Sequence, residues 1–295
     1  MYLSEIGGIE VKKDGFFENF GKLGRIYLQN SISFINSEKY LPYIDQNVSC
    51  IVCNEELLPF FLDKDIGIVV SKEPKNTFYD IYYTIYLEDK LNYSKNEISD
   101  TATISPKATI ASSGVIIGDN CVIGDNVVIR EGTILGNNVH IGNNCVLGSD
   151  GYEVAKIYGS SKIVPHTGFC ILKDNVEILN NCCVCKGLFR GYDTIIEENV
   201  KIDNIVQIAH AVRVGKNTEI GAGAVISGNT VVGEDVWIGP NVTLSNKIKI
   251  GNKAFVSLGA VVIDNIKDGE RVAGNFAYNT KKFMKEFKMK KSEGE

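Results

Sequence analysis

The chain is 295 residues long and carries 36 acidic and 31 basic side chains, so its formal net charge is −5. No block of basic residues precedes the C-terminal segment, which argues against a nucleic-acid partner. The N-terminus lacks the basic and apolar regions of a signal peptide, and no run of about 18 apolar residues occurs, so we expect a cytoplasmic protein without a membrane-spanning segment.

The first hundred residues differ in composition from the rest, because they hold 16 of the 26 Phe and Tyr residues. Three short apolar runs predict buried strands, at residues 32–35, 49–53 and 66–70. Residues 55–62 predict a short helix. Residues 74–87 predict a longer one, whose tyrosines follow its apolar side and are therefore expected to pack in a core rather than to bind a ligand. We expect an α/β domain over residues 1–98.

A six-residue repeat occupies most of residues 99–268. All twelve positions spaced six apart from Ile196 to Val262 are aliphatic, although only 44% of the chain is hydrophobic. An α-helix repeats every 3.6 residues and a strand every two, so neither produces this period. A parallel β-helix does, because each short strand with its turn takes one hexapeptide and three make one coil. Gly and Asn recur at the expected turns, where positive φ angles are needed.

The repeat is interrupted twice. It stops at residues 148–152 and resumes near residue 171, and a smaller disturbance covers residues 186–193. An interruption in a solenoid is a loop that leaves the coil, and such loops more often carry binding residues than core residues. After the last repeat, residues 269–295 form a C-terminal segment in which residues 279–291 predict a basic amphipathic helix.

The eight cysteines do not predict a metal site. Cys121, Cys145 and Cys182 occupy the fifth position of their hexads, where small residues recur. Cys50 and Cys53 have CxxC spacing, but they lie in an apolar stretch and no second ligand pair follows. A structural zinc ion needs four convergent ligands. We therefore expect buried free thiols and no metal.

Two segments resemble the UDP-3-O-acylglucosamine N-acyltransferases of lipid A assembly. Residues 202–210, which run from Ile-Asp-Asn to His210, are similar to the catalytic segment of that family. Residues 33–40 contain Phe34 and Tyr40, and in the family an aromatic pair of this spacing cradles uracil. The resemblance implies a left-handed parallel β-helix, a nucleotide-binding N-terminal domain and a homotrimer whose active sites lie between subunits.

The resemblance also implies a chemistry. Forming an amide from an amine and a thioester requires a base, and His210 suits this role because the pKa of histidine lies near operating pH. The alternative interpretation is an exposed turn histidine without a role, which is how we interpret His140 and His166. Gly228, eighteen residues later, should lie beside His210 and offer its N–H to the developing oxyanion. Asp203 and Asn204 are candidates for orienting the histidine or binding the sugar.

Three departures from the family pattern bear on the acyl donor. Ser37, a candidate for binding the nucleotide sugar, stands where the family has Asn. Lys247 falls where the family has a second histidine, and the C-terminal helical segment is short. These departures favour a short acyl group carried by coenzyme A, whose phosphates Lys247, Lys281 and Lys282 would bind. For the basic helix itself, a solvated surface or a dock for acyl carrier protein are the alternatives.

The predicted function is an N-acyltransferase that moves an acetyl or short 3-hydroxyacyl group from coenzyme A to the amine of a UDP- or dTDP-linked amino sugar, in lipopolysaccharide or surface polysaccharide synthesis. One alternative is the lipid A enzyme itself, with a long acyl chain on acyl carrier protein. A second is a non-catalytic β-helical subunit that binds nucleotides or assembles with other proteins. Carbonic anhydrase requires three zinc histidines, and the three present lie in unrelated contexts.

Overall fold

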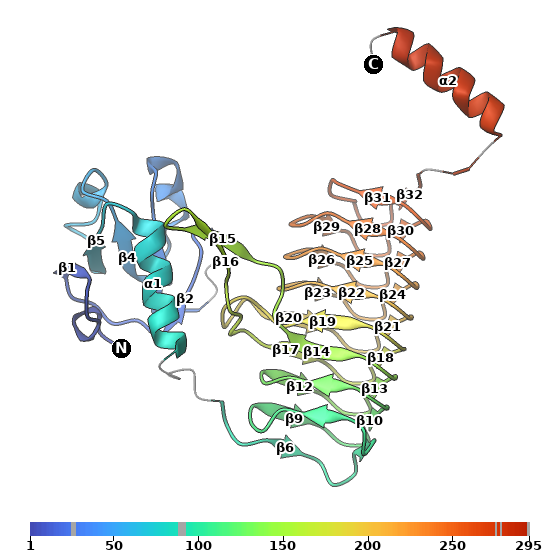
Figure 1. Cartoon of the computed structure of the whole chain (residues 1–295), viewed down its shortest axis with the longest axis horizontal. Coiled ribbons are helices and arrows are strands. Elements are labelled where there is room, and N and C mark those ends of the chain that lie inside the picture. Colours follow the sequence, from blue (N-terminus) through green and yellow to red (C-terminus); the bar gives the residue numbers. More distant parts are fainter. Residues whose placement is uncertain (25–27, 88–92, 275, 278, 294–295) are drawn as a thin grey trace.

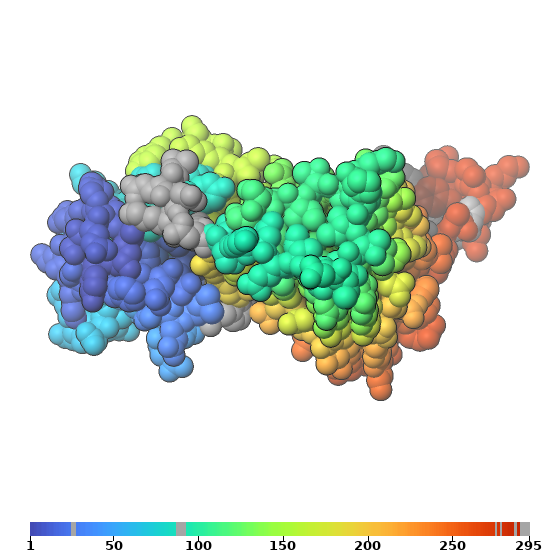
Figure 2. Space-filling view, turned by 90° about the horizontal axis from the view of Figure 1, so that it is seen from below, coloured from blue at the N-terminus to red at the C-terminus, as the bar shows by residue number. Residues whose placement is uncertain are grey.

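The computed structural model describes residues 1–24, 28–87, 93–274, 276–277 and 279–293. In this part of the chain, a small sheet at the N-terminal side stands next to a long coil of short strands, and a helix lies beyond the last coil (Figure 1). The molecule is elongated, with the N-terminal sheet near one end and the C-terminal helix at the other (Figure 2).

The N-terminal sheet has five strands among the described residues, in the order β1-β5-β4-β3-β2. Only β1 runs antiparallel to its neighbour. The strands are β1 (Glu10–Lys13), β2 (Asn19–Phe20), β3 (Ser31–Phe34), β4 (Val48–Cys53) and β5 (Gly67–Val70). The three predicted strands correspond to β3, β4 and β5.

The central strands of this sheet are buried on both faces, which explains their continuous apolar sequence. Ile51 packs on one face with Phe61, whereas Val52 packs on the other with Phe78 of helix α1 (Pro74–Leu87). Tyr79 of α1 is buried, in agreement with the prediction that the tyrosines of this helix pack in a core.

The helix predicted over residues 55–62 is the one wrong element of this region. Only a short 3₁₀ turn forms there, η3 (Leu58–Phe60), because a segment of eight residues containing Pro59 cannot sustain several turns of α-helix. Two further 3₁₀ turns, η1 (Leu3–Glu5) and η2 (Glu38–Tyr43), precede it.

The coil is a parallel β-helix whose described strands form three sheets. The first sheet contains nine strands: β7 (Thr103–Ile104), β10 (Val122–Ile123), β13 (His140–Ile141), β18 (Glu177–Ile178), β21 (Lys201–Ile202), β24 (Glu219–Ile220), β27 (Trp237–Ile238), β30 (Phe255–Val256) and β32 (Arg271–Val272). The second contains eight: β8 (Thr109–Ile110), β11 (Val128–Ile129), β14 (Val146–Ser149), β19 (Cys183–Cys185), β22 (Gln207–Ile208), β25 (Val225–Ile226), β28 (Thr243–Leu244) and β31 (Val261–Val262). The third also contains eight: β6 (Glu97–Ile98), β9 (Val115–Ile117), β12 (Thr133–Leu135), β17 (Cys170–Leu172), β20 (Thr194–Ile196), β23 (Arg213–Val214), β26 (Val231–Val232) and β29 (Lys249–Ile250).

The register of the coil follows the hexapeptide spacing. Gln207 pairs with Val225, eighteen residues later, and the same step recurs through the uninterrupted coils. All twelve aliphatic positions from Ile196 to Val262 lie in one buried core. Asparagines at the corners adopt positive φ, as at Asn217 and Asn229. The predicted β-helix with an N-terminal α/β region is confirmed, and its strands extend slightly beyond residues 99–268, from Glu97 to Val272.

Both interruptions of the repeat reach towards the N-terminal sheet. The first forms a hairpin of β15 (Val154–Ile157) and β16 (Ser160–Ile163), which contacts α1 (Figures 1 and 2). The second carries Phe189 and Tyr192, which pack into the same aromatic core as α1. These two loops thus join the coil to the N-terminal sheet.

The C-terminal helix, α2 (Thr280–Glu293), nearly matches the predicted range 279–291. Across the described ranges, no helix combines the length and apolar character needed to cross a membrane. The cysteines are free thiols, as predicted; all are buried except Cys183, which is half-buried. Within the same residues, no three His, Cys, Asp or Glu side chains converge as metal ligands would.

Candidate active site

A cavity of about 860 Å³ lies between the N-terminal sheet and the coil. It brings together five residues singled out from the sequence although they are up to 213 positions apart: Phe34, Tyr40, His210, Gly228 and Lys247. The first interruption of the repeat also lines it, through residues 152–155. Segments distant in sequence therefore form one site.

His210 follows strand β22 at a corner of the coil, and only 7% of its surface is exposed. A Cβ atom added to Gly151 would lie 2.6 Å from its Nδ1, and one added to Gly228 would lie 2.7 Å from its Nε2. Both distances are too short for a carbon contact. The imidazole ring therefore fits between two glycines, one from the insertion and one from the next coil.

A carboxylate and a lysine lie on the Nε2 side of His210. Glu153 Oε2 is 3.7 Å from His210 Nε2, and the other oxygen of Glu153 accepts a hydrogen bond from Lys22 Nζ. The backbone of Lys22 is fixed in turn, because its N–H donates to Tyr192 Oη (3.1 Å) and its carbonyl accepts from the same hydroxyl (2.9 Å). The N-terminal region and the second interruption thus hold Lys22 at the cavity.

A second histidine lies next to His210. The His166 ring is fully buried, and its centroid is 5.3 Å from that of His210 in an edge-to-face arrangement. Its Nδ1 donates to the carbonyl of Val164 at 2.9 Å, and its Nε2 has no hydrogen-bond partner within the described chain. Burial, and then the neighbouring His210, lower the pKa of His166 to about 4, so the ring is neutral near pH 7.

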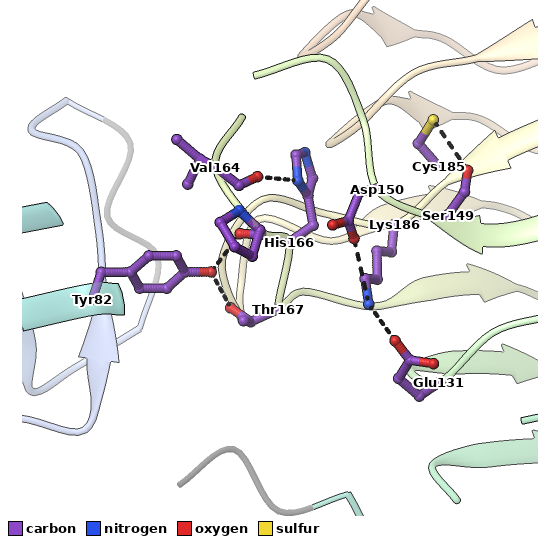
Figure 3. Close-up of polar contacts among 10 residues, drawn as sticks. Tyr82, Glu131, Ser149, Asp150, Val164, His166, Thr167, Cys185 and Lys186 are labelled. Carbon is purple, nitrogen blue, oxygen red and sulfur yellow. Dashed lines mark hydrogen bonds and ion pairs between the residues drawn. The ribbon is translucent and has the colours of Figure 1, made fainter. Parts of the chain in front are cut away.

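The insertion that carries Gly151, Glu153 and His166 is anchored at both ends (Figure 3). Tyr82 of α1 donates to the carbonyl of Pro165 at 2.6 Å and lies 3.2 Å from Thr167 Oγ1. At the other end, three charged side chains meet. Lys186 Nζ lies 3.1 Å from Glu131 Oε1 and 3.7 Å from Asp150 Oδ1. Of these three side chains Lys186 alone is buried, and loss of both carboxylates would leave its ammonium group without a counter-charge, so the two contacts hold this end of the loop.

Asp203 and Asn204 do not reach this cavity within one chain. Asp203 follows β21, which belongs to a different sheet from β22, and it lines a separate hollow with Lys201 and Trp237. Its Oδ1 accepts from the backbone N–H of Asn204 at 2.7 Å. Asn204 Oδ1 accepts from the N–H of Asn180 at 3.0 Å, as part of a ladder of stacked corner asparagines. Within the described single chain Asp203 thus lies on a different face of the coil from His210, and its role in orienting the histidine or binding the sugar stays a prediction.

The remaining predicted residues lie in three places. Asn36 lines the cavity, whereas Ser37, the predicted substrate-binding residue, is not among the lining residues. Lys247 lies in the cavity wall, at a corner with positive φ. Lys281 and Lys282 belong to α2, beyond the last coil, and are not among the residues that line the cavity (Figure 1).

Glu153 was not among the residues that the sequence singled out. The interpretation of His166 as an exposed turn histidine is wrong, because the ring is buried beside His210. Glu153 and His166 both lie inside the first interruption, where the hexapeptide repeat no longer defines which residues are neighbours. The only signal available was the interruption itself, which predicted a loop with binding residues but not which of them would reach His210. His140, the other histidine without an assigned role, is exposed on β13.

Known proteins resemble the coil in particular. Residues 114–149 and 193–228 match the family model described as bacterial transferase hexapeptide (six repeats), and residues 211–246 match that of the hexapeptide repeat of succinyl-transferase. A UDP-3-O-acylglucosamine N-acyltransferase of Caulobacter vibrioides (strain NA1000 / CB15N) is 49% identical over 123 residues, which are 42% of this chain and 36% of that protein.

UDP-3-O-acylglucosamine N-acyltransferase 2 of Legionella pneumophila (strain Philadelphia 1) is 43% identical over 143 residues, 48% of this chain and 41% of its own length. The matched stretch thus spans less than half of either relative. Among solved structures, a UDP-N-acetylglucosamine acyltransferase from Campylobacter jejuni matches 61% of this chain and 72% of its own, with a TM-score of 0.50 and 17% identity, and so shares the fold. Over these stretches the chain is similar to hexapeptide-repeat acyltransferases, and its parallel β-helix is the fold of the solved neighbour.

Proposed function

We propose that the chain is an N-acyltransferase that acylates the amine of a nucleotide-linked amino sugar. The observation that carries this proposal is the single cavity that joins Phe34 and Tyr40 to His210 and Gly228. Its volume of about 860 Å³ falls within the usual size of small-molecule sites, roughly 300–1,000 Å³. The relatives named as UDP-3-O-acylglucosamine N-acyltransferases support the same class of reaction.

The cavity supplies a polar end and an aromatic end for such a substrate. Tyr40 is 37% exposed, and Phe34 is half-buried against Phe78, with ring centroids 5.1 Å apart. Two aromatic rings at a cavity wall offer stacking surfaces for a nucleobase. We assign the nucleotide to this end and the amino group of the sugar to the end at His210.

At the polar end, His210 Nε2 packs against Gly228, and the thioester carbonyl would lie in the cavity beside both residues. The neutral amine attacks the carbonyl carbon, and His210 takes the proton that the new nitrogen bond releases. The backbone N–H of Gly228 is the proposed donor to the oxyanion, a contribution of a few kcal/mol in comparable sites. The missing Cβ of Gly228 leaves room for the His210 ring against the backbone, which brings the proposed base next to the proposed N–H donor.

We further propose coenzyme A as the carrier of a short acyl group. Lys247 in the cavity wall is suited to bind a phosphate of this donor. The alternative, a long acyl chain on acyl carrier protein, is favoured by the names of the relatives, which are enzymes of UDP-3-O-acylglucosamine. Lys281 and Lys282 on α2 would then serve as a dock for the acidic carrier protein.

A homotrimer completes the proposal. In one chain, Asp203 lies in a hollow separate from the cavity, on another face of the coil. In a cyclic trimer, that face of one subunit would stand beside the cavity of the next, and Asp203 would then approach a neighbouring His210. The proposed active site is therefore complete only between two subunits.

The test is a screen of UDP- and dTDP-linked amino sugars against acetyl-coenzyme A, 3-hydroxybutyryl-coenzyme A and a long-chain 3-hydroxyacyl carrier protein, read by mass spectrometry. We expect an amide product with a coenzyme A donor. Product with only the carrier protein would assign the lipid A reaction. If no pair of substrates yields product although nucleotide binds, the chain is instead a non-catalytic nucleotide-binding subunit.

A further inference from the structure

Glu153 is a charged residue of a loop, yet its side chain points into the cavity instead of into solvent. It is contributed by the first interruption of the repeat, yet its side chain is only 23% exposed and lines the cavity. One carboxylate oxygen lies 3.7 Å from His210 Nε2, the nitrogen that faces Gly228, while the other accepts from Lys22 Nζ. The carboxylate is thus held at the place where the amine and the thioester would meet.

We propose that Glu153 is a catalytic residue of this site: its carboxylate receives the ammonium group of the acceptor and then stabilises the protonated form of His210. This inference rests on the proposed function and assigns the acceptor as a cation, so it selects amino sugars over sugars that present a hydroxyl group. An anionic oxygen is the natural partner of an ammonium group, since hydrogen bonds between charged groups are about twice as strong as neutral ones.

The proton balance assigns Glu153 a role before and after the attack. The acceptor arrives as R–NH₃⁺, donates hydrogen bonds to Glu153 and loses one proton to solvent. Its nitrogen then forms the C–N bond with the thioester carbon, and a second proton passes to His210 Nε2. The resulting imidazolium lies beside the Glu153 carboxylate until the C–S bond breaks and the leaving thiolate takes that proton. The products are the amide, the thiol and one proton in solution.

Other charged groups around His210 have to be included in any titration. The insertion contributes Glu153 and the neutral ring of His166, and the N-terminal region contributes Lys22. Lys186, from the second interruption, lowers the pKa of His166 through its charge. Lys75 and Lys247 line the same cavity. Asp150 lies beside the His166 backbone and Lys186, whereas the carboxylate next to the His210 ring is that of Glu153. Most of the remaining groups are cations, which makes the Glu153 carboxylate more significant for a positively charged His210.

A purely structural role is the competing explanation, because the Lys22–Glu153 ion pair also links the N-terminal region to the insertion. The two explanations predict different behaviour for two matched variants. Glu153→Gln removes the carboxylate, and Lys22→Met removes the cation and leaves the carboxylate. Either variant breaks the ion pair, so a structural role predicts the same outcome for both.

The first measurement is a pH titration of the histidine ring signals by NMR on the full-length protein without substrate. The chain has three histidines, and His210→Gln assigns the signal of interest. We expect Glu153→Gln to lower the titration midpoint of His210 by about one pH unit and Lys22→Met to raise it, because the first removes an anion and the second a cation. Equal shifts in the same direction, or no shift in either variant, would overturn the role of Glu153.

The second measurement compares the binding of UDP-glucosamine and UDP-glucose by calorimetry. Wild type should prefer the amine by roughly 10- to 100-fold, because a hydrogen bond between an ammonium group and a carboxylate is stronger than one from the neutral hydroxyl of UDP-glucose. Glu153→Gln should lose this preference while it keeps its affinity for UDP-glucose, and Lys22→Met should retain the preference. If Glu153→Gln keeps the preference, the ammonium contact is wrong.

The proposed function and this inference fail in different ways. If wild type binds neither sugar, the proposed function is wrong for UDP-sugars, and the proposed contact between Glu153 and the ammonium group of the sugar is wrong as well. The NMR titration needs no substrate, and so it still decides whether Glu153 acts on His210. A wild type that acylates amino sugars while Glu153→Gln has the same pH profile and KM supports the function and overturns the role of Glu153.

Discussion

His210 can occupy its position only because its two neighbours lack side chains. Gly151 lies against one nitrogen of the ring and Gly228 against the other, each so close that a methyl group would displace the imidazole. The neutral His166 ring closes a further side. Packing against these three residues therefore holds the ring of the proposed base in place beside the Glu153 carboxylate.

The burial of His166 predicts a pH-dependent stability. The pKa of His166 is about 4 in the folded chain, below the usual value of 6.5. Between pH 4 and pH 6.5 this histidine is therefore protonated in the unfolded chain and neutral in the folded chain. Stability is therefore fully present above pH 6.5 and is lost as the pH falls towards 4. Between pH 7.5 and pH 5, this one group should cost about 2 kcal/mol of the free energy of unfolding.

Urea unfolding of wild type and His166→Gln at the two pH values checks this expectation. The free energy of unfolding of the variant should fall less on acidification, by about 2 kcal/mol. His140→Gln, which removes an exposed histidine, serves as the control. An identical loss in wild type and His166→Gln would show that His166 is not held neutral by the fold.

At the scale of elements, the coil is built from two-residue strands that alternate between core and surface. In β26, Val231 is 40% exposed while Val232 is 2% exposed. The same alternation recurs in most strands of the three sheets, and the inward residues form the single core of the coil. Each coil therefore depends on a few aliphatic side chains that neighbouring coils cover.

This alternation allows a matched test within one strand. Val232→Ala should lower the free energy of unfolding by about 2 kcal/mol, because buried methyl groups are lost and a cavity remains. Val231→Ala should change it by less than about 0.5 kcal/mol, since the side chain stays in solvent. Circular dichroism during urea unfolding measures both. Equal losses would contradict the assigned register of the hexads.

The coil was predictable from sequence because its physics is local and periodic. Spacing alone placed Gly228 beside His210, because eighteen residues make one coil. Spacing could not place His166 or Glu153, which lie in an insertion whose path depends on contacts with distant residues such as Tyr82. The same holds for β1 and β2, whose polar, short sequences carry little strand signal and which pair only because the apolar strands beside them already exist.

At the scale of the whole molecule, the site exists because two loops of the coil fasten the N-terminal sheet beside it. Phe189 and Tyr192 from the second interruption pack with Phe20 and Tyr82 of the N-terminal region. The first interruption contacts α1. This arrangement places the aromatic pair opposite His210 across one cavity, which no local pattern in the sequence could specify.

The division of the cavity predicts that the two substrates can be weakened separately. Tyr40→Ala should weaken nucleotide-sugar binding by about 3- to 10-fold, because stacking adds about 0.5–1.5 kcal/mol, and should leave the affinity for acyl-coenzyme A unchanged. Tyr43→Ala, at an exposed tyrosine outside the cavity wall, is the control. Calorimetry with each substrate alone gives the answer. A weakened acyl donor with an unchanged nucleotide sugar would mean that the ends of the cavity are assigned in reverse.

The most direct test of the proposed reaction is the turnover of His210→Asn with the amino sugar and donor found by the screen, measured together with its affinity for the nucleotide sugar. If His210 is the general base, kcat falls by roughly 10²–10⁴ while nucleotide-sugar affinity and the folded state remain as in wild type. If the variant turns over as fast as wild type, His210 has no part in the chemistry and the cavity is not the acyltransferase site proposed for it.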